Sequence, residues 1–101
     1  MITSKQRAYL RKLAHDIDPI FQIGKGGVSD EMLHQLSNAL EAREIIKIHV
    51  LESAGRDTKE LCNEVAKELH AEPVQAIGSK FVLYRAPKPT KKDKKIQLPG
   101  V

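Results

Sequence analysis

The first regular pattern of apolar and polar residues predicts an amphipathic helix over residues 3 to about 16. Its apolar positions recur at the intervals of one buried helical face: Leu10, Leu13, Ala14 and Ile17. Thr3 and Gln6 have the spacing of a capping box, which places the start of the helix. Pro19 ends the helical pattern, and the β-prone residues 20–23 then predict a short strand.

A second helix and a second strand follow. Ser29 is a favourable N-cap residue, and the apolar positions after it share one helical face: Met32, Leu33, Leu36, Ala39 and Leu40. Residues 45–51 are rich in β-branched side chains, which favour a strand. Within them Ile46, Ile48 and Val50 alternate with Lys47 and His49. This alternation predicts a strand with one buried face and one polar face.

The last part of the pattern predicts a third helix and a terminal hairpin. Asp57 and Glu60 again have the spacing of a capping box, and the apolar stripe after them consists of Leu61, Cys62, Val65, Ala66 and Leu69. Residues 73–77 and 81–85 are β-prone and are separated by the tight connection Gly78-Ser79-Lys80. The predicted order of elements is αβαβαββ, an α/β fold with three helices.

Composition indicates one small domain followed by a basic tail. A chain of 101 residues can bury one ordinary core, so we predict a single domain over residues 1–85. Residues 86–101 are rich in Lys and poor in apolar side chains, which predicts a flexible tail that Ile96 and Leu98 fix at its end. The single Cys62 and the lack of an apolar run of membrane-spanning length indicate a cytoplasmic protein with no membrane partner.

The formal net charge of +4 conceals three segments of different sign. Residues 1–27 carry five basic and two acidic side chains, and residues 73–101 carry seven basic and one acidic. Residues 28–72, by contrast, carry five basic and ten acidic side chains. Basic ends favour an anionic partner such as RNA, and surface solvation explains a moderately basic domain equally well.

The glycine-rich segment Gly24-Lys25-Gly26-Gly27 is the strongest candidate for chemistry. It joins a predicted strand to a helix N-terminus, where glycines let a ligand approach the backbone and free N–H groups favour an anion. Lys25 adds a mobile positive charge. The G-x-x-G loop of KH domains clamps the backbone of single-stranded nucleic acid, but there it joins two helices. A turn that only connects two elements explains the same four residues.

Several short motifs stand in a specific order along the chain: Lys5-Gln6, Leu13-Ala14-His15, Pro19, Gly24-Lys25-Gly26-Gly27, Glu44-Ile45-Ile46-Lys47, Val74-Gln75-Ala76-Ile77-Gly78 and Val82-Leu83-Tyr84-Arg85. Together they resemble the CRM domain, named for chloroplast RNA splicing and ribosome maturation, in its small single-domain bacterial form. The resemblance spans about residues 2–85. Ile96-Gln97-Leu98-Pro99 is similar to the ending of the bacterial members.

The resemblance implies a four-stranded mixed sheet with helices, similar to the C-terminal domain of translation initiation factor three. It also implies RNA binding through the glycine loop and adjoining basic surface, association with precursors of the large ribosomal subunit, and no enzymatic activity. We therefore predict these RNA-binding residues: Gly24, Lys25, Gly26 and Gly27 in the loop, with Lys5, Arg7, Arg11 and Lys12 on the first helix. The expected partner is ribosomal RNA, bound by a monomer with no cofactor and no small-molecule substrate.

Two other classes of function stay open. An adaptor could bind a basic ribosomal protein through the acidic middle of the chain, and a small nucleotide-handling enzyme could use the glycine loop. The four histidines, His15, His34, His49 and His70, lack the spacing of paired ligands, so no metal site is predicted. No catalytic residue is predicted either, because no nucleophile has a plausible neighbouring base. Tyr9 is either a partly buried structural residue or a surface on which a base stacks.

Overall fold

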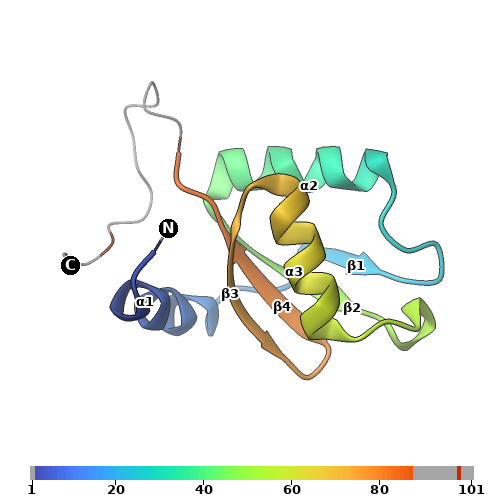
Figure 1. The fold of residues 1–101 in the computed structure, drawn as a ribbon, viewed down its shortest axis with the longest axis horizontal. Coiled ribbons are helices and arrows are strands. Elements are labelled where there is room, and N and C mark those ends of the chain that lie inside the picture. The colour runs from blue at the N-terminus through green and yellow to red at the C-terminus, as the bar shows by residue number, and fades with distance from the viewer. Residues whose placement is uncertain (1, 88–97, 99–101) are drawn as a thin grey trace.

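The structure, a computed structural model, is described over residues 2–87 and 98, and its elements follow the predicted order (Figure 1). The helices are α1 (Ser4–Ala14), α2 (Asp30–Arg43) and α3 (Thr58–Leu69). The strands are β1 (Phe21–Ile23), β2 (Ile45–Val50), β3 (Glu72–Ile77) and β4 (Lys80–Tyr84), and a short 3₁₀ helix, η1 (Glu52–Ala54), follows β2. The predicted fold of three helices and a four-stranded mixed sheet is confirmed.

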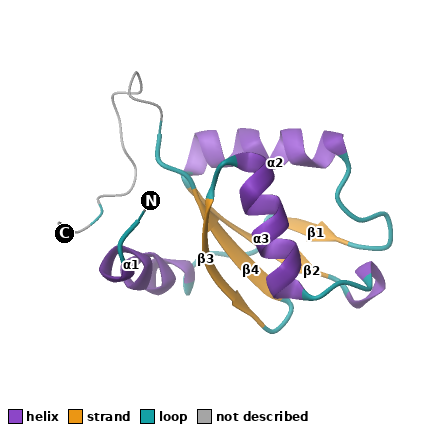
Figure 2. Ribbon diagram, viewed as in Figure 1, coloured by secondary structure: helices purple, strands orange, loops and turns teal. Residues whose placement is uncertain are grey.

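The four strands form one sheet in the order β1-β2-β4-β3 (Figure 2). β1 and β2 are parallel and are connected through α2, whereas β4 is antiparallel to both β2 and β3. The β3–β4 hairpin turns through Gly78 and Ser79, with Gly78 at a φ of 60°. Because β1 and β2 are parallel, the segments that follow them emerge at the same edge of the sheet.

Side-chain caps fix the starts of the helices at the predicted residues. Thr3 Oγ1 accepts a hydrogen bond from Gln6 N at 3.1 Å, and Gln6 Oε1 accepts one from Thr3 N at 3.0 Å. These two bonds complete the predicted capping box. Ser29 and Asp57 cap α2 and α3, each accepting a bond from the backbone N–H three residues further on. The local sequence therefore determines where all three helices begin.

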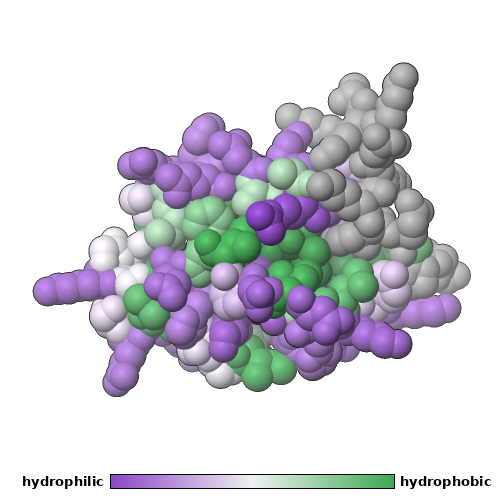
Figure 3. All heavy atoms as spheres, turned by 180° about the vertical axis from the view of Figure 1, so that it is seen from behind, coloured by the Kyte–Doolittle hydropathy of each residue, from purple (hydrophilic) through white to green (hydrophobic). Residues whose placement is uncertain are grey.

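Helices cover both faces of the sheet, and each face has its own core. α2 and α3 lie on one face and α1 on the other (Figure 2). The main core, on the α2–α3 face, consists of Ile23, Leu36, Leu40, Ile46, Ile48, Val50, Leu61, Cys62, Val65, Ala66, Leu69, Phe81 and Leu83. The smaller core, under α1, consists of Leu10, Ala14, Ile45, Val74, Val82 and Tyr84. Viewed from behind, apolar residues show as a band between hydrophilic margins (Figure 3).

The smaller core corrects the prediction that β2 has one polar face. Ile45 shares its face with Lys47 and His49, since residues two apart in a strand point the same way. Ile45 is nevertheless only 7% exposed, because α1 packs over that end of the strand. The predicted polar face is present only toward the carboxyl end of β2, where Lys47 and His49 are half-buried.

Most of the predicted tail lies outside the described residues, and Ile96 is among those left out. Leu98 is described, and it packs half-buried against the smaller core. Among the helices of the described chain, none is long and apolar enough to cross a membrane.

Candidate nucleic-acid interface

The segment from Gly24 to Gly27 forms a tight turn at the carboxyl end of β1. Gly27 N donates to Gly24 O at 2.9 Å, and this bond places Lys25 and Gly26 at the corner of a β-turn. Gly27 has a φ of 69°, a left-handed conformation that glycine adopts without strain. Lys25 and Gly26 are exposed. The glycine turn, as we call residues 24–27, therefore presents one ammonium group and bare backbone at its tip.

Gly24 allows the turn to lie close to the segment that follows β2. A Cβ atom at Gly24 would lie 3.3 Å from Ser53 Oγ, which is tighter than ordinary contact, and 3.4 Å from Leu51 Cδ1. Leu51 N also donates to Ile23 O at 2.8 Å. The base of the turn is thus fixed against η1. A Cβ atom at Gly26 would meet nothing within 4 Å, so the tip of the turn is open.

The N-terminus of α2 is a poor site for an anion. Ser29 Oγ already accepts a bond from Met32 N at 3.1 Å, which satisfies one of the free N–H groups. Asp30 and Glu31 place two carboxylates in the first turn of the helix, where they offset its positive end. The capacity of this region to bind an anion therefore rests on Lys25 and the backbone of the turn.

The basic residues predicted on α1 lie far from the glycine turn, since helix and turn are at opposite ends of the molecule (Figure 1). Lys5, Arg11 and Lys12 are exposed. Arg7 is half-buried, and its Nε donates to Pro73 O at 3.2 Å, which ties α1 to β3. The structure does not bring the two predicted groups of RNA-binding residues into one compact site.

A row of side chains crosses the sheet near the carboxyl end of β1, and the sequence alone did not predict it. Gln22 is in register with His49, His49 with Lys80, and Lys80 with Ile77. Residues in register share a face, and His49 shares the face of Ile45, which α1 covers. At this end of the strands the face is open: Gln22, Lys80 and Ile77 are exposed, and Ile77 is 66% exposed.

This sheet row, as we call Gln22, His49, Lys80 and Ile77, begins two residues before Gly24. Its exposed Lys80 adds one positive charge to the face that carries α1. In the sequence, the only indication of this row was the alternation of polar residues in β2. The cross-strand neighbours were not predictable, because they depend on a strand order that joins distant segments.

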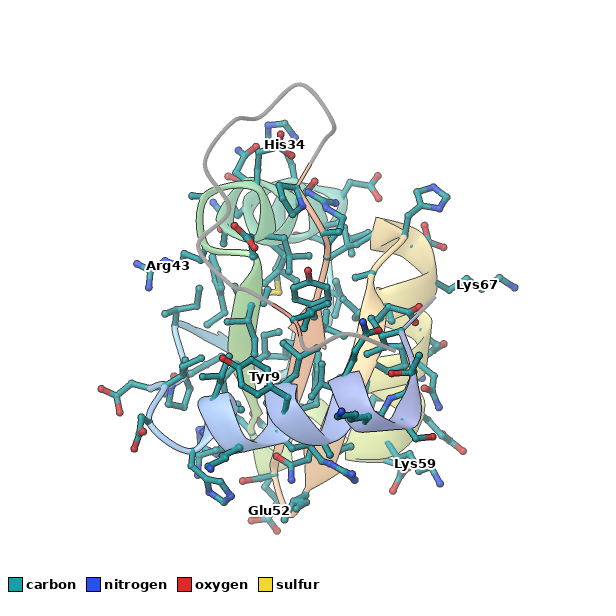
Figure 4. All side chains as sticks on the ribbon, turned by 90° about the vertical axis from the view of Figure 1, so that its left-hand side faces the viewer. Tyr9, His34, Arg43, Glu52, Lys59 and Lys67 are labelled. Carbon is teal, nitrogen blue, oxygen red and sulfur yellow. The ribbon has the colours of Figure 1, made fainter. Side chains whose placement is uncertain are left out.

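Arg85, at the end of the last motif, holds the helices together. Its Nη1 donates to Leu69 O at 3.0 Å, and its Nη2 donates to Ser37 O at 2.8 Å and to Glu41 Oε2 at 3.4 Å. Arg85 thus joins β4 to α2 and α3, a structural role. Tyr9 is 37% exposed on α1 (Figure 4), so part of its ring is open to a ligand.

Cys62 offers no nucleophile to the site. It is 2% exposed in the main core, and burial raises the pKa of its thiol from 9.0 to about 11. The thiol is therefore protonated at neutral pH. Within the described residues, no three His, Cys, Asp or Glu side chains gather as a metal site would require.

The family of the chain follows from comparison with known proteins. Residues 2–85 match the model of the CRS1 / YhbY (CRM) domain. The chain belongs to the CRM domain family. It is 46% identical over 99 residues to the "Probable RNA-binding protein YqeI" of Bacillus subtilis (strain 168), an alignment that covers 98% of this chain and all of the relative. The predicted family is thereby confirmed.

Two further relatives agree with this assignment. An "RNA-binding protein" of Haemophilus influenzae is 38% identical over 99 residues, covering 97% of this chain and 95% of the relative. The solution structure of the hypothetical protein SAV1595 from Staphylococcus aureus has the same fold as this CRM domain, with a TM-score of 0.79 and 50% identity over 98% of this chain and 100% of that one.

Proposed function

We propose that this CRM domain binds ribosomal RNA in precursors of the large ribosomal subunit and assists assembly by stabilising one arrangement of that RNA. No covalent bond is made or broken. The observation that carries the proposal is the exposed Lys25 at the tip of an open glycine turn that continues into the sheet row. The relatives named as RNA-binding proteins support RNA as the ligand. The association with large-subunit precursors rests on the resemblance to bacterial members of the family.

In this proposal, the central contact is between an RNA phosphate and the glycine turn. Lys25 meets this phosphate as a mobile point charge, and the absence of a side chain at Gly26 lets the phosphate approach backbone N–H groups. His49 and Lys80 continue the surface toward α1, where Arg11 and Lys12 add positive charge. Phosphate contacts of this kind position an RNA without reading its sequence. The protein acts in this scheme as a cytoplasmic monomer without a cofactor, and residues 86–101 add general electrostatic attraction.

Lys25→Ala tests the phosphate contact. The variant should bind two unrelated single-stranded RNAs more weakly and to a similar degree, and the slope of log affinity against log salt should fall in magnitude by about 0.7. Lys25→Arg should largely restore the charge effect. Fluorescence titrations at several salt concentrations measure both quantities.

Lys67→Ala is the matched control, because Lys67 is an exposed lysine on α3, on the opposite face of the sheet from α1 (Figure 4). It removes the same charge and should change the affinity less. If both variants lost the same RNA affinity, Lys25 would act only through the overall charge of the protein and not through a specific phosphate contact. A loss confined to one RNA with an unchanged slope would assign Lys25 to a base edge instead.

Sedimentation tests the association with ribosomal particles. A tagged protein should migrate with large-subunit precursors in a gradient, and digestion of the RNA should release it. Association that survives complete RNA digestion would contradict the proposal and favour a protein partner on the particle.

A further inference from the structure

A groove lies between α2 and α3, beside the glycine turn and on the other face of the sheet from α1. It has a volume of about 310 Å³, and Gly27 lines the end next to the turn. The apolar side chains that line it are the half-buried Val28 and Leu33, with the core residues Ile23, Leu61 and Val65 beneath them. The charged side chains that line it are Asp30, Arg56, Glu64 and Glu68. The α2–α3 groove thus combines an apolar lining with a margin of charges.

The charged margin is predominantly negative. Arg56 Nη2 donates to Glu64 Oε2, so the guanidinium is already paired at the exposed margin of the groove. Among residues 2–87, neither Asp30 nor Glu68 forms an ion pair, and both are exposed. Two carboxylates therefore remain at the margin without a cationic partner.

These charges decide which kind of chain the groove accepts. An RNA backbone would bring phosphates next to Asp30, Glu64 and Glu68, and such like-charge contacts are unfavourable. Lys and Arg side chains would instead find complementary partners at Asp30 and Glu68. The apolar lining would accept an aliphatic side chain between them, as the central part of a protein interface does. A basic polypeptide with an apolar anchor fits both features.

Leu98 is the described residue nearest the end of this chain's basic tail. Leu98 packs against the smaller core, together with Leu13 and Ile17, on the opposite face of the sheet. Since Leu98 is on that face, the occupant considered for the groove is a basic segment of another protein.

We propose that the α2–α3 groove docks a basic segment of a partner protein, with an apolar side chain on its lining and Lys or Arg side chains against Asp30 and Glu68. The proposed RNA contacts lie on the glycine turn and the α1 face, so the two proposed sites share only Gly27, which lines the end of the groove. The domain would hold an RNA on one face and a basic protein segment on the other.

The experiment uses the full chain and a synthetic nonapeptide, Lys-Leu-Arg repeated three times, as the probe. Titrated into isotopically labelled protein, the peptide should shift the amide NMR signals of residues 30–36 and 61–68 and saturate below about 1 mM. The double variant Asp30→Asn with Glu68→Gln should bind about fivefold more weakly. A peptide with Gly in place of Leu should also bind more weakly, because it lacks the apolar anchor.

The control variant is Asp16→Asn with Glu31→Gln, which changes the net charge equally at exposed positions outside the groove. It should bind the peptide like the parent protein. Equal losses for the two variants, shifts mainly outside residues 30–36 and 61–68, or no saturation would overturn the proposal. A short oligouridylate tests RNA as the occupant: the groove variant should not lose affinity for it relative to the control variant. If only the groove variant lost affinity for the oligouridylate, the ligand of the groove would be RNA and not a basic peptide.

Discussion

The two faces of the sheet differ in helix cover, in core and in charge. The α1 face is covered by one helix over a small core, and its open end carries His49 and Lys80. The α2–α3 face is covered by two helices over the main core, and its groove carries Asp30 and Glu68 at the margin. A net charge of +4 therefore describes neither surface. Under our two proposals, the sheet separates a surface that binds phosphates from one that binds basic side chains.

The comparison predicts that substitutions on the two faces of β4 lower the free energy of unfolding by different amounts. Phe81 is 0% exposed in the main core, whereas its neighbour Val82 is 2% exposed in the smaller core on the other face. Phe81→Ala should lower the free energy of unfolding by about 3–5 kcal/mol through lost burial and a residual cavity. Val82→Ala removes two methyl groups and should cost about 2 kcal/mol. Urea unfolding measures both values.

Equal losses of unfolding free energy for the two variants would contradict this prediction. The two cores would then contribute equally to stability despite their different sizes. Ile77→Ala is a control on the same hairpin. It replaces a side chain that is 66% exposed, so it should change stability by less than about 0.5 kcal/mol.

The two adjacent glycines of the turn should respond differently to alanine. Gly27 has a φ of 69°, so Gly27→Ala should cost about 1–2 kcal/mol of stability. Gly26 has open space around its Cβ position and no positive φ, so Gly26→Ala should leave stability unchanged within about 0.5 kcal/mol. Thermal unfolding compares them. A large loss at Gly26 would show that the tip of the turn is constrained and that it cannot serve as an open approach for phosphate.

Local signals in the sequence were sufficient to predict the elements. Thr3 and Ser29 cap helices by side-chain bonds to residues three positions away, and such short-range chemistry is visible in the sequence. The burial of Ile45 was not visible, because it depends on α1 crossing a strand that lies thirty residues further along the chain. The similarity to translation initiation factor three stays a prediction.

For the candidate site too, the sequence predicted the local features and missed those that depend on distant segments. Lys25 and its glycines form one contiguous segment, and the structure shows the expected exposed turn. The sheet row was missed because β2 pairs with β4 across the intervening α3 and β3, so the proximity of His49 to Lys80 has no local signature. The α2–α3 groove was missed for the same reason, although the acidic composition of residues 28–72 indicated a second type of partner.

Lys80→Ala tests whether the sheet row belongs to the RNA surface. Lys80 is exposed on the α1 face, so its removal should weaken RNA binding about twofold to fivefold and lower the salt slope by about 0.7. The basic peptide should bind the variant like the parent protein. An RNA affinity equal to that of Lys67→Ala would confine the RNA surface to the glycine turn and α1.

Two buried acids, one on each face, make the stability of the domain depend on pH in the alkaline range. Burial raises the pKa of Cys62 from 9.0 to about 11, and burial, followed by the negative charge of Glu44, raises the pKa of Tyr84 above 10.0. In each case the folded protein keeps its proton to a higher pH than the unfolded chain does. Both groups therefore contribute stability that is fully present below the ordinary pKa and is lost as pH rises.

The two losses begin at different pH values, so they can be separated by urea unfolding between pH 7 and about 11. Cys62→Ala should flatten the decline that begins near 9.0, and Tyr84→Phe should flatten only the part above 10.0. Each variant also removes packing, so the test compares the slopes of stability against pH and not their absolute values. A Cys62→Ala slope equal to that of the parent would show that the thiol titrates at the same pH in the folded and unfolded chains. The main core would then be open to solvent at Cys62, contrary to its 2% exposure.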